Sequence, residues 1–248
     1  MSIPPTVLLV GGTGRTGGRV LRQLLDRGVA VRAIVRSVGK IPPDVAGNPN
    51  LTLIEASLLS LGDEELRRHL RGCEAVISCL GHVINFKGVF GPPRDLVASA
   101  TARLCRAIEA LGQPAPVKFI LMSSVSVHRP GSLDTRRSLF ERAFLFLLRG
   151  VLPPARDNQR AADFLREKIG PDNAFVQWVA VRPDSLLEGD ITAYTLHEGL
   201  VNRLFAPGST NMANVAHFMC DLATDPRAWA DWKFKLPVIV NATAEKPA

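Results

Sequence analysis

The residues best suited to do chemistry stand near the start of the sequence, in a turn with three regularly spaced glycines. The turn, Gly11-Gly12-Thr13-Gly14-Arg15-Thr16-Gly17, directly follows the apolar run Val7 to Val10 and precedes a helix-periodic segment. Glycines at these positions permit a sharp turn, let phosphate approach the backbone, and let the helix pack close to the strand. The N-terminus of that helix points unpaired N–H groups at the phosphate. Instead of a tight turn without a ligand, we therefore predict a pyrophosphate site formed by Gly11, Thr13, Gly14, Arg15, Thr16 and Gly17.

The residue after the second predicted strand indicates which dinucleotide binds. An NAD-specific site usually has Asp or Glu there, which accepts hydrogen bonds from the adenosine ribose. This sequence has Arg36, with Ser37 and Lys40 close behind it. A guanidinium at this place can pair with a 2′-phosphate and stack on adenine, whereas the alternative is an exposed arginine without a ligand. The pattern favours NADP(H) as the cofactor.

Apolar runs alternate with segments of helical periodicity along most of the 248 residues. This alternation predicts an α/β fold, a Rossmann-like doubly wound parallel sheet flanked by helices, in a single domain over 1–248. We expect a proline- and glycine-rich loop over 42–49. The predicted strands are 7–10, 30–35, 51–55, 75–79, 117–122 and 175–181, and the predicted helices are 19–27, 63–70, 95–111 and 158–168.

The order and spacing of several segments resemble those of the atypical short-chain dehydrogenase/reductase family, in its NAD(P)H-binding, NmrA-like branch. The resemblance covers nearly the whole chain, and the glycine turn is its most specific part. A later stretch, 211–216, resembles the start of the family's helix after the sixth strand. The matching segments are 8–17, 33–37, 75–81, 119–124 and 179–183.

The resemblance implies a dinucleotide lying across the carboxyl ends of the strands. It places Leu80 and Gly81 by the adenine-side ribose and pyrophosphate, and Ser123 and Ser124 near the nicotinamide. Many relatives have Gly-Asp after the third strand, where Ser57 and Leu58 stand in this sequence as the expected adenine-side contacts. A small substrate-side region is expected from the segments 128–156 and 184–212. The residues expected to close over the carboxamide are Pro183, Asp184 and Ser185.

The catalytic Tyr-x-x-x-Lys of the larger dehydrogenase branch is missing, because Tyr194 is the only tyrosine and follows the sixth strand. The candidates for acid or hydrogen-bond donor are therefore Ser124, His82 and Asn158. Each has a simpler alternative. Ser124 could only fasten the strand end, His82 could be an ordinary loop histidine, and Asp157 or Asn158 could cap a helix over 159–168, which is the interpretation we favour there.

Composition excludes several other classes of protein. The chain has a net charge of +7, but its arginines are spread over many segments, which favours a solvated surface over a nucleic-acid site. The five histidines show no metal-ligand spacing, so we expect no metal site. No signal peptide or membrane-spanning run is recognisable, and four scattered cysteines suggest a cytoplasmic protein with reduced thiols.

The most apolar stretch, 139–152, contains Phe140, Phe144 and Phe146. It could be a core helix, a membrane-surface contact, a partner-binding helix or a wall over an apolar substrate, and its place after the fifth strand favours the wall. We therefore expect an NADPH-dependent reductase of a small or apolar carbonyl, quinone or flavin-like acceptor. The alternatives are a redox-sensing regulator that binds NADP(H) and a protein partner without turnover, and a non-redox isomerase or assembly factor. A homodimer is also possible.

Overall fold

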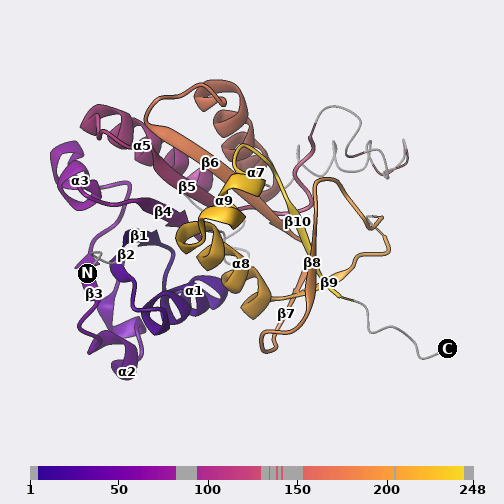
Figure 1. Ribbon diagram of the computed structural model, residues 1–248, viewed down its shortest axis with the longest axis horizontal. Coiled ribbons are helices and arrows are strands. Elements are labelled where there is room, and N and C mark those ends of the chain that lie inside the picture. The colour runs from indigo at the N-terminus through magenta and orange to yellow at the C-terminus, as the bar shows by residue number, and fades with distance from the viewer. Residues whose placement is uncertain are drawn as a thin grey trace.

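The protein folds around one eight-stranded sheet with helices on both faces, as a computed structural model shows (Figure 1). The structure describes residues 5–81, 94–129, 153–203 and 205–242, together with Asp134, Ser138 and Glu141. The strand order is β3-β2-β1-β4-β5-β6-β10-β8, and every pairing is parallel except that of β8 with β10. The strands are β1 (Thr6–Val10), β2 (Ala30–Val35), β3 (Leu51–Glu55), β4 (Ala75–Ser78), β5 (Val117–Met122), β6 (Val176–Pro183), β8 (Tyr194–His197) and β10 (Val238–Asn241).

The order of the strands reverses between β1 and β4, because the chain moves outward from β1 to β3 and then returns to the other side of β1. The crevice at such a reversal, outside the carboxyl ends of the strands, is where open α/β sheets bind ligands. The glycine turn follows β1 at this point, and the backbone N–H of Cys79 after β4 donates to Val10 O at 2.9 Å.

One helical layer covers each face of the sheet. The central strands are buried on both faces, so their side chains alternate between two apolar cores. Leu8, Val76 and Phe119 face the layer of α3 (Asp63–Leu70), α5 (Leu96–Leu111) and α7 (Pro153–Phe164). Leu9, Ile77 and Ile120 face the layer of α1 (Arg15–Asp26), α8 (Met212–Thr224) and α9 (Pro226–Trp232). The predicted doubly wound α/β fold is confirmed.

Several boundaries differ from those expected, and each has a local cause. Helix α1 begins at Arg15, because the glycine turn itself forms its first turn. A 3₁₀ turn (Val38–Lys40) precedes the expected loop over 42–49, and the loop itself contains the short helix α2 (Pro43–Ala46), since Pro43 suits the first turn of a helix. Helix α7 begins five residues before the expected Asn158, and the chain continues as a π-helical turn over Leu165–Ile169.

The last part of the chain forms structure that periodicity did not predict. A separate two-stranded parallel sheet pairs β7 (Ser185–Leu187) with β9 (Ser209–Asn211), beside the carboxyl end of β6. Helix α8 begins at Met212 with Asn211 in the N-cap position, which agrees with the helix start inferred from the family resemblance.

Candidate functional site

The glycine turn has the close backbone contacts that its three glycines predict. Gly11 has a positive φ of 82°, and a Cβ atom there would lie 2.5 Å from the carbonyl carbon of Cys79. A Cβ on Gly17 would lie 2.1 Å from Gly11 O, so the helix could not pack this close with any other residue. Gly14 N donates to Gly11 O at 3.0 Å and stands at the N-cap of α1. The exposed backbone at Gly14 therefore has no Cβ that would hold a phosphate away from the N-terminus of α1.

The other expected cofactor contacts lie along the same edge of the sheet. Arg36 follows β2 as an exposed side chain, and no other described residue bonds it. Leu80 and Gly81 follow β4 beside the glycine turn. Ser57 is exposed after β3, whereas the Leu58 side chain is buried in the core and its carbonyl oxygen accepts from Arg103 at 3.0 Å. Any contact of Leu58 with adenine would have to use its backbone.

Thr13 and Arg15 are exposed on the glycine turn, and Thr16 is buried in the first turn of α1. Arg15 Nη2 bonds Glu188 Oε1 at 2.8 Å, and Arg19 also bonds this carboxylate. Both arginines hold the pKa of Glu188 below its usual value, with the hydrogen bond from Arg15 as the largest cause. The loop after β7 thus meets the N-terminus of α1 through an exposed ion pair.

The carboxyl ends of β5 and β6 enclose a small polar pocket of about 290 Å³. Ser124 stands at its edge, and its Oγ accepts from Ser126 N at 3.2 Å, which leaves the hydroxyl proton available to donate. Ser123 is 5% exposed, and its Oγ has no hydrogen-bond partner among the described residues. The residues that line the pocket are Ser124, Val125, Ser126, Asp184, Ser185, Asn202, Arg203 and Pro207.

Asp184 links three segments around this pocket by hydrogen bonds. Its Oδ2 accepts from Asn202 Nδ2 at 3.1 Å and from Gly208 N at 3.0 Å, and its Oδ1 accepts from Ser185 N at 2.9 Å. Pro183 is buried, and its carbonyl oxygen accepts from Val125 N at 3.2 Å. Of the three residues expected to close over the carboxamide, Asp184 and Ser185 line the pocket, and the buried Pro183 precedes them at the end of β6.

A buried arginine beneath the pocket holds its segments together. Arg182 is fully buried, and its Nη1 forms an ion pair with Asp134 Oδ2 at 2.8 Å. Its Nε donates to Leu236 O at 2.9 Å, and other guanidinium hydrogens reach Val127 O and Glu198 O. Burial lowers the pKa of Arg182, which the hydrogen bond to Asp134 opposes. Sequence analysis missed this role, since nothing in the sequence indicates that an arginine in strand β6 is buried.

The two catalytic candidates that the structure describes, Ser124 and Asn158, do not line the same pocket. Ser124 lines the pocket, Asn158 lies on α7 and does not line it, and His82 falls outside the described residues. The helix-cap interpretation of Asp157 and Asn158 was wrong, because α7 begins at Pro153 and both residues lie inside it. Asp157 instead caps α5: its carboxylate accepts from Val97 N at 2.7 Å and from Ala98 N at 2.9 Å.

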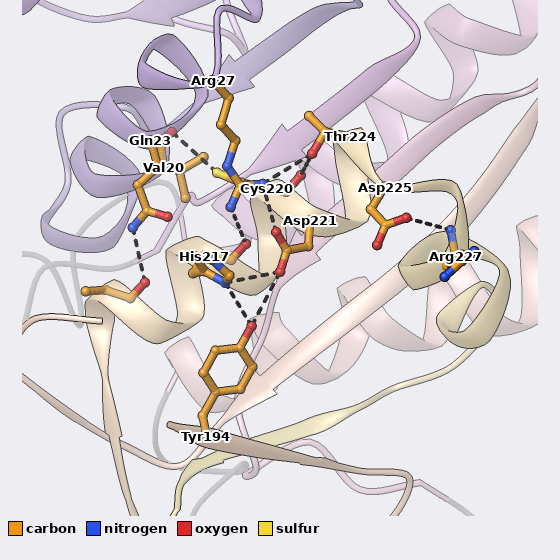
Figure 2. A network of polar contacts seen from close by, with 11 residues as sticks. Val20, Gln23, Arg27, Tyr194, His217, Cys220, Asp221, Thr224, Asp225 and Arg227 are labelled. Carbon is orange, nitrogen blue, oxygen red and sulfur yellow. Dashed lines mark hydrogen bonds and ion pairs between the residues drawn. The ribbon is translucent and has the colours of Figure 1, made fainter. Parts of the chain in front are cut away.

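The only tyrosine is held in a polar network between β8, α8 and the end of α1 (Figure 2). Tyr194 Oη lies 3.0 Å from His217 Nδ1 and donates to Asp221 at 3.5 Å, and Arg27 at the end of α1 pairs with Asp221 at 2.8 Å. Burial, with Asp221 nearby, raises the pKa of Tyr194 to about 12. Tyr194 does not line the Ser124 pocket, so it does not replace the missing catalytic tyrosine.

The family of the chain follows from a comparison with known sequence families. The model of an NAD(P)H-binding family matches residues 11–226, which include the glycine turn, Arg36 and the carboxyl ends of β4, β5 and β6. The chain belongs to this NAD(P)H-binding family. The predicted dinucleotide cofactor and the resemblance to atypical short-chain dehydrogenases/reductases are thereby confirmed.

Known relatives show how far this likeness extends. The chain is 29% identical over 205 residues to an uncharacterized chloroplastic protein of Arabidopsis thaliana, which covers 79% of this chain and 67% of the relative. A short-chain dehydrogenase/reductase from Veillonella parvula in complex with NADP superposes with a TM-score of 0.69 at 15% identity, over 99% of this chain and 100% of the other. An oxidoreductase from Lactococcus lactis gives a TM-score of 0.68 at 19% identity, over 96% and 92%. At these identities the solved structures establish the fold alone.

The described residues offer neither a membrane-spanning helix nor a cluster of metal ligands. Within the ranges given above, no helix is both long and apolar enough to cross a lipid bilayer. The same part of the chain contains no cluster of three or more His, Cys, Asp or Glu side chains arranged to hold a metal ion.

Proposed function

We propose that the protein is an NADPH-dependent reductase of a small carbonyl, quinone or flavin-like acceptor. The observation that carries the proposal is the Ser124 pocket. It opens at the carboxyl ends of β5 and β6, on the same edge of the parallel sheet as the glycine turn after β1. A dinucleotide bound across this edge brings its nicotinamide toward β5 and β6, where a substrate must lie.

The residues present fit NADP(H). The exposed glycine backbone at Gly14, just before α1, suits a pyrophosphate, and Arg36 supplies the cation that a 2′-phosphate requires. The cofactor, when bound, supplies a hydride. Leu80, Gly81 and Ser57 lie along the same edge, and the unbonded Ser123 hydroxyl can donate to the cofactor.

The chain's own contribution is to hold and polarise the acceptor. Ser124 donates its hydroxyl proton as a hydrogen bond to the acceptor oxygen and so stabilises the negative charge that develops there. Serine is too weak an acid to protonate the product, so the proton comes from water or from another group. Most residues that line the pocket have polar side chains, which suits a small polar acceptor group. The apolar stretch 139–152, expected to cover the rest of the substrate, lies outside the described residues except for Glu141.

The replacement of Ser124 by Ala tests this role. We expect turnover of NADPH with a carbonyl, quinone or flavin acceptor to fall by about 10²-fold, because one hydrogen bond to developing charge is lost. The NADPH dissociation constant should stay within about twofold of the wild-type value. Ser126→Ala serves as the control, since its hydroxyl lines the same pocket. If Ser124→Ala instead weakens NADPH binding and leaves turnover unchanged, the serine belongs to the cofactor contacts.

A second candidate function is a redox-sensing regulator that binds NADP(H) and a protein partner without turnover. The observation in its favour is that the sole tyrosine is bound by His217 and Asp221 and is absent from the pocket lining. This function predicts that the wild-type protein oxidises NADPH with none of a broad panel of acceptors and binds NADPH and NADP⁺ with clearly different affinities.

The four free cysteines support a reducing compartment, which we propose is the cytoplasm.

A further inference from the structure

Helices α3, α5 and α7 border a groove of about 770 Å³ that the reductase proposal does not use. It lies on the outer surface of the helical layer seen at the upper left of Figure 1, whereas the glycine turn leads into α1 in the opposite layer. Its lining extends along α5 from Ala98 to Ala110, nearly the whole helix. The groove is long enough to take a helix of about three turns, at 1.5 Å per residue.

The floor of the groove is made of small and apolar side chains. Ala98, Ala102 and Ala110 lie on one ridge of α5, which Arg106 interrupts between the last two, and Leu59 and Phe164 add apolar side chains to the lining. Alanine side chains let a second helix approach an axis closely, as ridges-into-grooves packing requires. The floor thus suits the apolar face of an amphipathic helix.

The rim of the groove is strongly basic. Four arginines from three helices line it, Arg67, Arg103, Arg106 and Arg160, and Asp63 is the only acidic residue in the lining. Arg67 pairs with Glu64, and Arg103 pairs with Asp63 and bonds Leu58 O. Arg106 and Arg160 are exposed and form no hydrogen bond or ion pair with other residues that the structure describes. Two cations are therefore available to a bound anion.

We infer that this groove binds an amphipathic helix of a partner protein, with apolar side chains on the alanine floor and carboxylates against Arg106 and Arg160. Charge decides between this occupant and a second copy of the chain. A two-fold interface would bring the same patch of both copies together, so the unpaired Arg106 and Arg160 of both copies would lie in one interface. Like charges so placed oppose association, whereas an acidic helix neutralises them.

A designed peptide tests the inference without any NADPH chemistry. The probe is a fluorescent helical peptide with one Ala/Leu face flanked by glutamates, and the matched control peptide has lysine in place of each glutamate. Binding is followed by anisotropy, and the site by amide chemical shifts in NMR spectra. We expect the glutamate peptide to bind and the lysine peptide not to bind. The changes in amide chemical shift should be confined to α3, α5 and α7, and binding should weaken as salt is added.

Two pairs of variants separate docking in the groove from general attraction to a chain of charge +7. Arg106→Glu with Arg160→Glu should weaken binding by about tenfold or more, whereas Arg227→Glu with Lys233→Glu at α9, two exposed residues with the same total change of charge, should not. Ala102→Trp, which fills the floor without changing charge, should abolish binding, whereas Ala230→Trp on α9 should not. Neither pair touches a residue of the cofactor site or the Ser124 pocket, so NADPH binding should be unchanged in all four proteins.

Several results would overturn the inference. Absence of binding up to millimolar peptide would do so, as would equal losses in the groove and α9 variants. A dimer that Ala102→Trp splits into monomers would make a second copy the occupant. Phosphatidylserine vesicles or duplex DNA that bind through Arg106 and Arg160 while the peptide does not would assign the arginines to a membrane or to nucleic acid.

Discussion

The two ends of the ligand-binding edge are built differently. The cofactor end takes its turn, helix start and Arg36 from the continuous segment 6–37, where residues close in sequence contact one another. The pocket end combines Ser124, Asp184 and Asn202, which are far apart in sequence, and relies on Arg182, whose partners Val127, Asp134 and Leu236 lie 55, 48 and 54 residues away. Short-range constraints fix the first end, and one buried polar cluster fixes the second.

Loss of Arg182 should disrupt the pocket end and cause the largest loss of stability among the proposed variants. Arg182→Met removes one partner of a buried ion pair and leaves Asp134 without its cation, which should cost about 3–5 kcal/mol in the free energy of unfolding. Where the variant is still folded, turnover should fall and NADPH affinity should persist. Denaturant unfolding and NADPH titration measure the two quantities.

The double variant Arg182→Met with Asp134→Leu provides the control for this prediction. It removes both charges and should recover most of the lost stability, because no unpaired charge remains buried. Equal destabilisation of the single and double variants would show that the ion pair does not hold the pocket segments together.

Gly17→Ala should break the cofactor end instead. The added Cβ would lie 2.1 Å from Gly11 O, so the turn and α1 must separate. We expect a loss of about 2 kcal/mol or more in stability, and NADPH binding weaker by more than about tenfold. Gly62→Ala is the control, because Gly62 also lies at the start of a helix, as the N-cap of α3, and a Cβ there has no atom within 4 Å. Similar results for the two variants would contradict a special role for Gly17.

Arg36 tests cofactor preference at the cofactor end separately from the structure of the glycine turn, because its side chain is exposed and bonds no other described residue. Arg36→Ala should weaken NADPH binding by about 10- to 100-fold, the loss of charge-assisted hydrogen bonds to the 2′-phosphate, and leave NADH binding almost unchanged. Isothermal titration with both cofactors measures this. Equal losses for NADPH and NADH would remove the argument for the 2′-phosphate contact, and Lys40→Ala shows whether the neighbouring lysine assists.

The smallest effect concerns the network that links α1 to β8 through α8 (Figure 2). Because Tyr194 is the only tyrosine, its ultraviolet absorbance titration reports one group, with an expected pKa of about 12 in the folded protein. This folded-state pKa is above the unfolded value of about 10. The neutral hydroxyl therefore contributes stability below pH about 10, and this contribution is lost as the pH rises toward 12.

Tyr194→Phe should lower the stability at neutral pH by about 0.5–1.5 kcal/mol, the usual contribution of such a hydrogen bond. The variant should also lack the stability loss of the wild-type protein between pH 10 and 12 that arises from this group. A tyrosine pKa near 10 in the folded protein would show that the hydroxyl is neither buried nor engaged by Asp221.

The local parts of the site could be predicted from sequence because backbone sterics act over few residues. Gly11, Gly14 and Gly17 predicted the turn, and the alternation of apolar runs with helical segments predicted the doubly wound sheet. The interpretation of Asp157 was wrong because the residue lies inside α7. Its carboxylate instead accepts hydrogen bonds from the N-terminus of α5, about sixty residues earlier in the sequence. Capping residues for another helix leave no periodic signal.

The sequence by itself determined the order of the elements, the dinucleotide-binding turn and the cation that follows β2, since each depends on neighbouring residues. Tertiary structure alone decided which charges meet. It buried Arg182 against Asp134 and gathered Arg67, Arg103, Arg106 and Arg160 from three helices around one groove, although in sequence these arginines are indistinguishable from a solvated surface. The physical reason is that the free energy of a charged side chain depends on its burial and on the charges near it. Both are set only when segments distant in sequence pack together.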